Sequence, residues 1–307
     1  MGTVHQLTSG SQTASLGHAA AAYLAALDHP ESAGTRRVYG STMRAFVARF
    51  GASTALDTLR ADNVAAWFST TWGRRAPATW NRNRDALRGL LAYCQTQGWV
   101  GDAGALSRGL RRRRRAPDRS RALSRPDVEQ LLAREDIALR EKALWRLLYE
   151  TAARSAEVLR LDVEDLDLPN RKAKVRRKGG AIDVIVWQTG TARLLPRLIK
   201  GRKAGPLFLT DRRARVELPP GDIDTASGRA RLSYRQAEQL FKDATDGATL
   251  HQLRHSALTH DAEDGVSAPM LMTKSGHTSI TSLARYARPS AEALARMQAQ
   301  RDPARRR

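Results

Sequence analysis

The stretch 249–289 concentrates side chains whose types suit work on a phosphate group. His251 and Arg254 stand three residues apart, which places both on one face of a predicted helix. His277 follows a glycine at a predicted helix start, and Tyr286 comes nine residues later. Cationic donors hold phosphate oxygens and the charge that grows in a transition state, while a phenol oxygen attacks phosphorus in line. A single His or Tyr is more often structural, so the prediction of phosphodiester chemistry rests on the whole set.

Two further motifs lie upstream of this stretch. Arg154 and Glu157 form an Arg-x-x-Glu run in a predicted helix. Lys178 precedes two glycines at the turn of a predicted hairpin, 24 residues after Arg154, and Lys174, inside a predicted strand, is the alternative hairpin lysine. The order Arg-x-x-Glu, hairpin Lys, His-x-Leu-Arg-His, Gly-His and Tyr resembles that of the tyrosine recombinases, also called the phage integrase family.

The resemblance implies which residues supply the nucleophile, the general base and the proton donor for DNA cleavage. Tyr286 is the expected nucleophile, which attacks a DNA phosphate to give a 3′-phosphotyrosine and a free 5′-hydroxyl. A phenol is mostly protonated at neutral pH, and His251 is the general base that the resemblance implies. Lys178 is expected to protonate the leaving 5′-oxygen.

The resemblance assigns the remaining site residues to the phosphate itself. Arg154 and Arg254 are expected to hold its non-bridging oxygens through planar guanidinium groups, and His277 to donate a further hydrogen bond. Glu157 is expected to orient its neighbours, and Ser275 stands where the family commonly has an apolar residue. Because the covalent link conserves the energy of the broken bond, no cofactor is implied. The sequence also has neither a GxxxxGK[ST] loop nor a metal-ligand cluster.

Composition and charge indicate a polyanionic partner. The chain has 307 residues, with 52 Lys and Arg against 31 Asp and Glu, which gives a net charge of +21. Such a surplus is typical of proteins that bind nucleic acid, and the resemblance makes the partner double-stranded DNA. The single cysteine, Cys94, excludes an intramolecular disulfide, and no apolar run reaches the roughly 18 residues of a membrane span. We therefore expect a soluble, cytoplasmic protein.

The fold class predicted is mainly α, in two domains. Amphipathic helices without strand signals fill the first domain, which resembles the SAM-like core-binding domain of the family. The second is expected to be a mixed, mostly helical catalytic domain with a small antiparallel β-sheet. The expected segments are a disordered lead at 1–15, the core-binding domain at 16–104, an arginine-rich linker at 105–121 and the catalytic domain at 122–307.

Patterning and turn residues predict the elements of each domain. In the first, helices are expected at 16–27, 35–50, 59–70 and 78–98. In the second, they are expected after the N-cap Ser124, at 137–151, at 233–243 and around residue 251, with a final helix at 290–300 that exchanges with a neighbouring protomer. Strands are expected within 172–187 and at 207–209, and residues 211–232 are expected to form a loop.

Exposed basic and amide side chains are the candidate DNA contacts, because such groups suit phosphates and base edges. Those on predicted helices are Arg36, Arg37, Arg44, Asn81, Arg82, Asn83, Arg84 and Arg88, and those in the linker are Arg111, Arg112, Arg113, Arg114 and Arg115.

The favoured function is site-specific DNA recombination, by a tetramer assembled on paired DNA sites, with an accessory protein or second recombinase as a possible partner. The alternatives are a type IB topoisomerase or telomere resolvase with the same chemistry, a non-catalytic DNA-binding protein on the same fold, and a basic structural or RNA-binding protein. The motifs leave open whether the biological role is DNA integration or chromosome dimer resolution.

Overall fold

The computed structural model describes residues 14–27, 33–114, 122–177, 180–284, 294–295 and 297–299. Contacts within the chain divide it into two compact units, Met1–Ala116 and Pro117–Arg307. Within the described ranges, no helix combines the length and the apolar character needed to cross a membrane. Residues 1–13 of the predicted lead and most of the predicted exchange helix lie outside the described residues.

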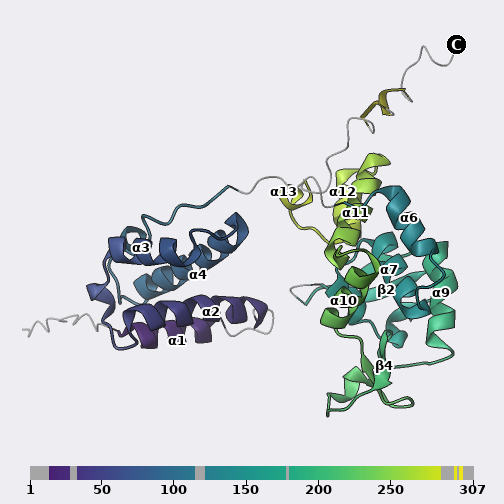
Figure 1. Ribbon diagram of the computed structural model, residues 1–307, viewed down its shortest axis with the longest axis horizontal. Coiled ribbons are helices and arrows are strands. Elements are labelled where there is room, and N and C mark those ends of the chain that lie inside the picture. Colours follow the sequence, from purple (N-terminus) through teal and green to yellow (C-terminus); the bar gives the residue numbers. More distant parts are fainter. Residues whose placement is uncertain are drawn as a thin grey trace, which may run out of the picture. The chain divides into compact units, whose positions relative to one another are not determined.

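The first unit is built from helices, as its sequence pattern predicts. They are α1 (Leu16–Ala26), α2 (Ala33–Phe50), α3 (Ala61–Trp72), α4 (Pro77–Thr96), the short α5 (Ala103–Leu106) and the 3-10 turn η2 (Leu56–Thr58) (Figure 1). The side chain of Ser15 caps the first turn of α1, and Pro77 opens α4, where its missing N–H costs no helical bond. The core is rich in aromatic rings: Phe68 and Trp80, for example, meet edge to face at 4.8 Å.

The first part of the predicted linker belongs to this unit. Leu110 is 2% exposed, and the indole N–H of Trp80 donates to the carbonyl of Arg111 at 2.9 Å. The guanidinium of Arg113 lies 3.7 Å from the centre of the Trp80 ring. The prediction of a linker from residue 105 is therefore wrong at its N-terminal end, because these residues pack on α4.

The second unit combines eight helices and two small sheets among its described residues. The helices are α6 (Arg125–Ala133), α7 (Leu139–Thr151), α8 (Ser155–Leu159), α9 (Thr189–Ile199), α10 (Tyr234–Ala244), α11 (Leu250–Glu263), α12 (Ala268–Ser275) and α13 (Ile280–Leu283). One antiparallel sheet has the order β1-β2-β3, with β1 (Leu166–Asp167), β2 (Lys172–Arg176) and β3 (Ile182–Val186). The other has the order β4-β6-β5, with β4 (Leu209–Arg213), β5 (Ile223–Asp224) and β6 (Arg229–Arg231). The 3-10 turns are η3 (Val163–Asp165) and η4 (Pro220–Asp222).

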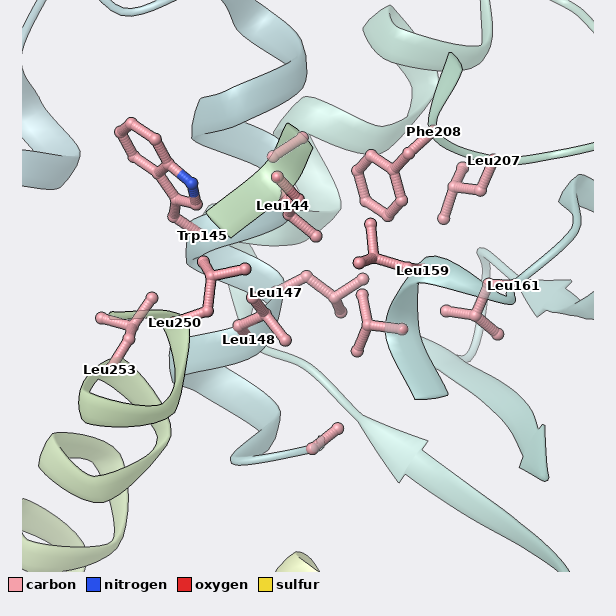
Figure 2. Packing of buried hydrophobic residues seen from close by; sticks show 14 of the residues in the cluster. Leu144, Trp145, Leu147, Leu148, Leu159, Leu161, Leu207, Phe208, Leu250 and Leu253 are labelled. Carbon is pink, nitrogen blue, oxygen red and sulfur yellow. The ribbon is translucent and has the colours of Figure 1, made fainter. Parts of the chain in front are cut away.

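Helix α7 is the centre of this unit. Its Leu144, Leu147 and Leu148 are almost fully buried and lie beside Leu250 and Leu253 of α11 (Figure 2). Burying a leucine side chain contributes about 2 kcal/mol, so this contact fixes α11 firmly against α7. The packing holds the end of α7 and the start of α11, both of which carry predicted site residues, in one rigid body.

The second sheet corrects the prediction of a loop at 211–232. Its strands are two to five residues long and carry charged side chains, so they show little of the apolar alternation that marks a strand. Ion pairs stabilise this sheet: the guanidinium of Arg231 in β6 contacts Asp162 and Asp222, each at 2.7 Å. Figure 1 shows β4 at the end of this unit opposite α12.

Helix α9 was not predicted from the sequence. It contains Pro196 and begins with Thr189 and Gly190, which weaken the helical signal. Glu150 of α7 compensates from outside the helix, because its carboxylate accepts the backbone N–H groups of Gln188 at 2.9 Å and Thr191 at 3.3 Å. An acidic group at a helix N-terminus also interacts favourably with the helix dipole.

Candidate active site

The first turns of α11 carry two predicted site residues. Thr249 and Gln252 form a capping box, and the carboxylate of Glu238 accepts the Leu250 N–H at 3.1 Å, so the start of this helix is well defined. On it, His251 is exposed, whereas Arg254 is only 3% exposed. Within the first turns of α11, His251 therefore lies at the surface and Arg254 lies in the interior of the protein.

Arg254 joins two distant segments. Its Nη1 donates to the carbonyl of Ala152, just after α7, and its Nη2 donates at 2.8 Å to the carbonyl of Ser275, at the end of α12. Ala152 has a φ of 49°, in the left-handed region that residues with a side chain seldom adopt. This backbone conformation ends α7 and directs the carbonyl of Ala152 at the arginine.

Arg154 and Glu157 lie on the neighbouring turn. Arg154 is the N-cap of α8, and the carboxylate of Glu157 accepts its backbone N–H at 3.1 Å and its Nη1 at 2.8 Å. The Nη2 of Arg154 reaches the carbonyl of Gly276 at 3.5 Å. The Arg154 side chain is 40% exposed, so its guanidinium is accessible to an anion while Glu157, buried beneath it, fixes its direction.

Arg177 is a member of this cluster that sequence reasoning missed. Its side chain is 7% exposed; its Nη1 donates to Glu157 at 2.7 Å, and its Nε donates to Asp183 at 3.0 Å. The signal was the strand period. Ala173 and Val175 of β2 point inward, and a residue two places further on continues the same face. Arg177 is therefore an interior cation next to the exposed Arg176.

His277 lies in the turn between α12 and α13. Gly276, with a φ of 65°, ends α12 as its C-cap, so the prediction of a helix start at this glycine is wrong. The Nδ1 of His277 lies 2.6 Å from the hydroxyl oxygen of Ser275. Burial, followed by the charges of Arg254, Arg154, Arg177 and His251, lowers the pKa of His277 to about 4. At neutral pH this ring is therefore uncharged and carries a single N–H.

The turn 275–277 thus connects Arg154, Arg254 and His277, with Glu157 behind them. Two further predicted site residues, Lys178 and Tyr286, lie outside the described residues. Strand β2 ends at Arg176 and strand β3 begins at Ile182, so Lys178 lies between the two strands in the sequence. Lys174, the alternative lysine, lies inside β2 with its side chain exposed. Within the described part of the chain there is no group of three or more His, Cys, Asp or Glu side chains that could hold a metal ion.

The predicted DNA contacts fall into an exposed set and an interior set. The exposed residues are Arg36, Arg37 and Arg44 on α2, Arg82 and Arg88 on α4, and Arg111, Arg112 and Arg114 after α5. Arg112 contacts Asp85 at 3.1 Å, and Arg115 lies outside the described residues.

Asn81 and Asn83 are interior residues, contrary to the expectation that they contact DNA. The amide of Asn81 exchanges two 2.8 Å hydrogen bonds with the backbone of Arg113. Asn83 accepts from the hydroxyl of Thr42 at 2.7 Å and donates to the carbonyl of Thr79 at 2.9 Å. Both are at most 3% exposed, because their amide groups satisfy buried backbone and side-chain partners.

The side chains of Arg84 and Arg113 also make hydrogen bonds within the first unit. Arg84 is 12% exposed, with its Nε donating to the carbonyl of Leu110 at 2.6 Å and its Nη1 to Asp85 at 2.9 Å. Arg113 donates to the carbonyl of Gly73 at 2.7 Å. These arginines hold the segment after α5 in place.

The chain matches a known protein family and a curated relative in sequence. The family model described as "Phage integrase family" matches residues 121–293. Tyrosine recombinase XerC of Mycobacterium bovis is 31% identical over 281 residues, which cover 85% of this chain and 90% of the relative.

Solved structures are similar to this chain in fold. The Tn1549 transposon integrase in complex with a circular intermediate DNA gives a TM-score of 0.65 at 17% identity, and the match covers 94% of this chain and 100% of that chain. A lambda integrase dimer bound to a COC′ core site gives 0.69 at 16% identity, covering 91% and 78%. These likenesses confirm the mainly helical fold with small antiparallel sheets. The match to the family model and the similarity to XerC show that this chain belongs to the phage integrase family of tyrosine recombinases.

Proposed function

We propose that this chain binds a specific site in double-stranded DNA and recombines it through a covalent link to Tyr286. The observation that carries the proposal is the cluster in which Arg154 and Arg254 meet at the turn 275–277. Arg154 is braced by a buried carboxylate, and Arg254 by two backbone carbonyls. Two guanidinium groups held in this way suit a phosphate that gains charge during an in-line displacement.

In the proposed cleavage step, the phenol oxygen of Tyr286 attacks phosphorus, and the bond from phosphorus to the 5′-oxygen breaks. His251 takes the phenolic proton, and Lys178 delivers a proton to the 5′-oxygen as it leaves. Rejoining is the reverse reaction with a 5′-hydroxyl from another strand. No net hydrolysis occurs, so the energy of the phosphodiester is retained in the phosphotyrosine.

Arg154 and Arg254 are proposed to grip the non-bridging oxygens, and His277 to donate one hydrogen bond to them. The low pKa of His277 supports this role, since a neutral ring donates without adding a third positive charge to the pair of arginines. Glu157 acts through the arginines it contacts and not on the DNA. Its buried carboxylate keeps the guanidinium of Arg154 in one orientation.

Contact with the duplex outside the active site is assigned to exposed arginines of the first unit. Arg37, Arg44 and Arg88 are exposed on helices, and phosphate contacts by such side chains release condensed counterions. The Tn1549 and lambda integrase structures are complexes with DNA, and the lambda structure is a dimer. By analogy, several copies of this chain act together on paired sites, in the cytoplasm, where a reduced Cys94 is expected.

Trapping of a covalent DNA complex tests the proposal. The chain is incubated with fragmented DNA that contains its site, denatured, and the DNA that remains attached is sequenced. The recovered duplex is then nicked a few nucleotides to the 3′ side of the cleavage position, so that the short fragment with the free 5′-hydroxyl diffuses away and the covalent complex accumulates. We expect a denaturant-resistant adduct for the natural chain and none for Tyr286→Phe, which still binds the duplex within a few-fold.

Three outcomes separate the alternatives. An adduct with Tyr286→Phe contradicts the assignment of the nucleophile. Relaxation of supercoiled plasmid without any joining of two duplexes indicates a type IB topoisomerase instead of a recombinase. Duplex binding without an adduct in the natural chain indicates a non-catalytic DNA-binding protein.

A further inference from the structure

The buried carboxylate of Glu157 is shared by two arginines from different segments. Its Oε1 accepts from Nη1 of Arg154 at 2.8 Å. Its Oε2 accepts from the backbone N–H of Arg154 at 3.1 Å and from Nη1 of Arg177 at 2.7 Å. Arg154 is the N-cap of α8, whereas Arg177 directly follows β2. Because both oxygens have charged partners, the carboxylate cannot turn without breaking a strong hydrogen bond.

Two further contacts hold Arg177 in place. Its Nε donates to the carboxylate of Asp183 in β3 at 3.0 Å, and its Nη1 lies 3.5 Å from the carbonyl oxygen of Ser275. The guanidinium therefore lies between Glu157 and the turn 275–277. It connects the β2–β3 hairpin to the two segments that carry Arg154 and His277.

The stability of the fold does not explain why a charged side chain occupies this position. The Arg177 side chain is 7% exposed, and among the residues that the structure describes its buried Nη2 has no hydrogen-bond partner. Removing a guanidinium from water and leaving one of its donors unsatisfied is unfavourable, and an apolar side chain often stabilises such a position as well. The charge does reach the phosphate site, because burial, and then charges that include Arg177, lower the pKa of His277.

Glu157 has two opposite effects on Arg154. It directs the guanidinium, but its negative charge also offsets the positive charge that a phosphate would meet. The Glu157 side chain is 5% exposed, so water screens that charge weakly. Arg177 places a second positive charge against the same carboxylate. Asp183, the other acidic partner of Arg177, has a side chain that is 39% exposed, so solvent screens its charge more strongly.

We propose that Arg177 is a positioning residue for Arg154. It holds the second oxygen of Glu157 and offsets the negative charge of that carboxylate, so that Arg154 faces the scissile phosphate in one orientation and with its positive charge undiminished. Arg177 itself does not touch the DNA. The inference deepens the proposed function and rests on it for the identity of the phosphate.

Two nicked duplexes separate this role from a purely structural one. The first has the natural phosphate at the cleavage position. The second has a methylphosphonate there, in which a methyl group replaces one non-bridging oxygen and the negative charge is absent. Both duplexes still need attack by Tyr286 and a proton on the leaving 5′-oxygen. A residue that acts through the grip of Arg154 on charged oxygens therefore matters mainly for the first duplex.

Single-turnover cleavage by Arg177→Met is the main measurement. Loss of a hydrogen bond to a charged group corresponds to roughly a 10- to 100-fold change, and we expect slowing on that scale for the phosphate duplex. Relative to the natural chain, the methylphosphonate duplex should be slowed much less, and Arg154→Lys should show the same preference. The matched control is Arg176→Gln, which removes a positive charge from the adjacent, exposed residue and should affect both duplexes alike. Equal slowing of the two duplexes by Arg177→Met overturns the proposal.

The double variant Arg154→Lys, Arg177→Met tests whether the two residues act together. If Arg177 acts through Arg154, the double variant should be slowed by less than the product of the two single factors. Strict multiplication of the two factors overturns the proposal.

Arg177→Lys and Arg177→Gln keep the test decisive if the methionine chain does not fold. Lysine retains the positive charge and is expected to restore most of the rate on the phosphate duplex. Glutamine retains hydrogen-bond donors without the charge and should show the duplex preference expected for methionine. Equal behaviour of the lysine and glutamine variants on both duplexes overturns the proposal.

Nitrogen NMR of the full chain tests the orientation of Arg154 without DNA. The protein is labelled with 15N-arginine, and the guanidinium signals of Arg154 are assigned from their absence in Arg154→Lys. We expect slow rotation about the Nε–Cζ bond of Arg154 in the natural chain and faster rotation in Arg177→Gln, and equal rotation in the two overturns the proposal. If the natural chain forms no covalent DNA complex, the proposed function fails, and this measurement still decides whether Arg177 positions Arg154.

Discussion

Arg177 and Gly276 occupy adjacent space in the structure: a Cβ added at residue 276 would lie 2.7 Å from Cζ of Arg177. The guanidinium is only 7% exposed and is held by Glu157 and Asp183, so it cannot easily move aside. The glycine is needed both for its positive φ and for this contact. The relationship links the β2–β3 hairpin to the turn that carries His277.

We therefore expect Gly276→Ala to be more destabilising than its backbone strain alone explains. A side chain at positive φ costs about 1–2 kcal/mol, and the clash adds to it. Gly265→Ala is the matched control, because Gly265 also has a positive φ but a methyl group added there would meet no atom within 4 Å. Urea unfolding of both variants measures the difference. In the double variant Gly276→Ala, Arg177→Ala the excess loss should disappear, and strict additivity would contradict the contact.

The two site arginines are expected to respond differently to lysine. Removing a donor that acts in the transition state slows a reaction by about 10²- to 10³-fold. Both Arg154→Lys and Arg254→Lys should therefore slow cleavage of the nicked duplex by at least that factor. Arg154 is 40% exposed, whereas Arg254 is buried with two carbonyls on its guanidinium. Only Arg254→Lys should also lower the free energy of unfolding clearly. Normal cleavage by both variants would make these arginines structural.

Acid is expected to destabilise the chain through His277. The pKa of this ring is lowered in the folded state, to about 4, from its ordinary value near 6.5. The unfolded chain therefore binds the proton more readily, so the stabilisation is complete above about pH 6.5 and is lost as the pH falls toward 4.

Urea midpoints measured between pH 7 and pH 4 test this expectation. His277→Gln should flatten part of the decline. His260 also contributes to the loss of stability in acid, because burial and then Arg125 lower its pKa. The flattening in His277→Gln should therefore be partial. An identical decline in the natural chain and in His277→Gln would contradict the assignment.

The sequence predicted those parts of the fold that local rules determine. Helix α7 has regular apolar spacing, the predicted N-cap Ser124 begins α6, and the helix expected at 233–243 is α10. What it could not predict depends on partners distant in the chain. The left-handed turn at Ala152 is favoured by the contact with Arg254, and no local preference of alanine indicates it.

The same distinction applies to the candidate site. The motif residues were found by type and spacing, but their burial was not. A reading by residue type treats all arginines and asparagines on a basic helix as surface groups, which is why Asn81 and Asn83 were expected to contact DNA. Their actual partners are Arg113, Thr42 and Thr79, at least four residues away along the chain.

Binding of the duplex at different salt concentrations separates surface arginines from these interior asparagines. Each phosphate contact contributes about 0.9 to the slope of log affinity against log salt concentration. Because Arg37 and Arg44 are exposed on α2, the double variant Arg37→Gln, Arg44→Gln should lower the magnitude of the slope by about 2 and weaken binding to all sequences alike.

Asn81→Ala is the control, and it should behave in the opposite way. Its amide holds the backbone of Arg113 through two 2.8 Å hydrogen bonds, so its loss should lower the free energy of unfolding by about 1–3 kcal/mol. The salt slope should stay the same, because no phosphate contact is removed. Fluorescence anisotropy with a labelled duplex, at several salt concentrations, measures the slope, and urea unfolding measures the stability. A reduced slope for Asn81→Ala at unchanged stability would restore this residue as a DNA contact, and an unchanged slope for the double arginine variant would remove α2 from the DNA-binding surface.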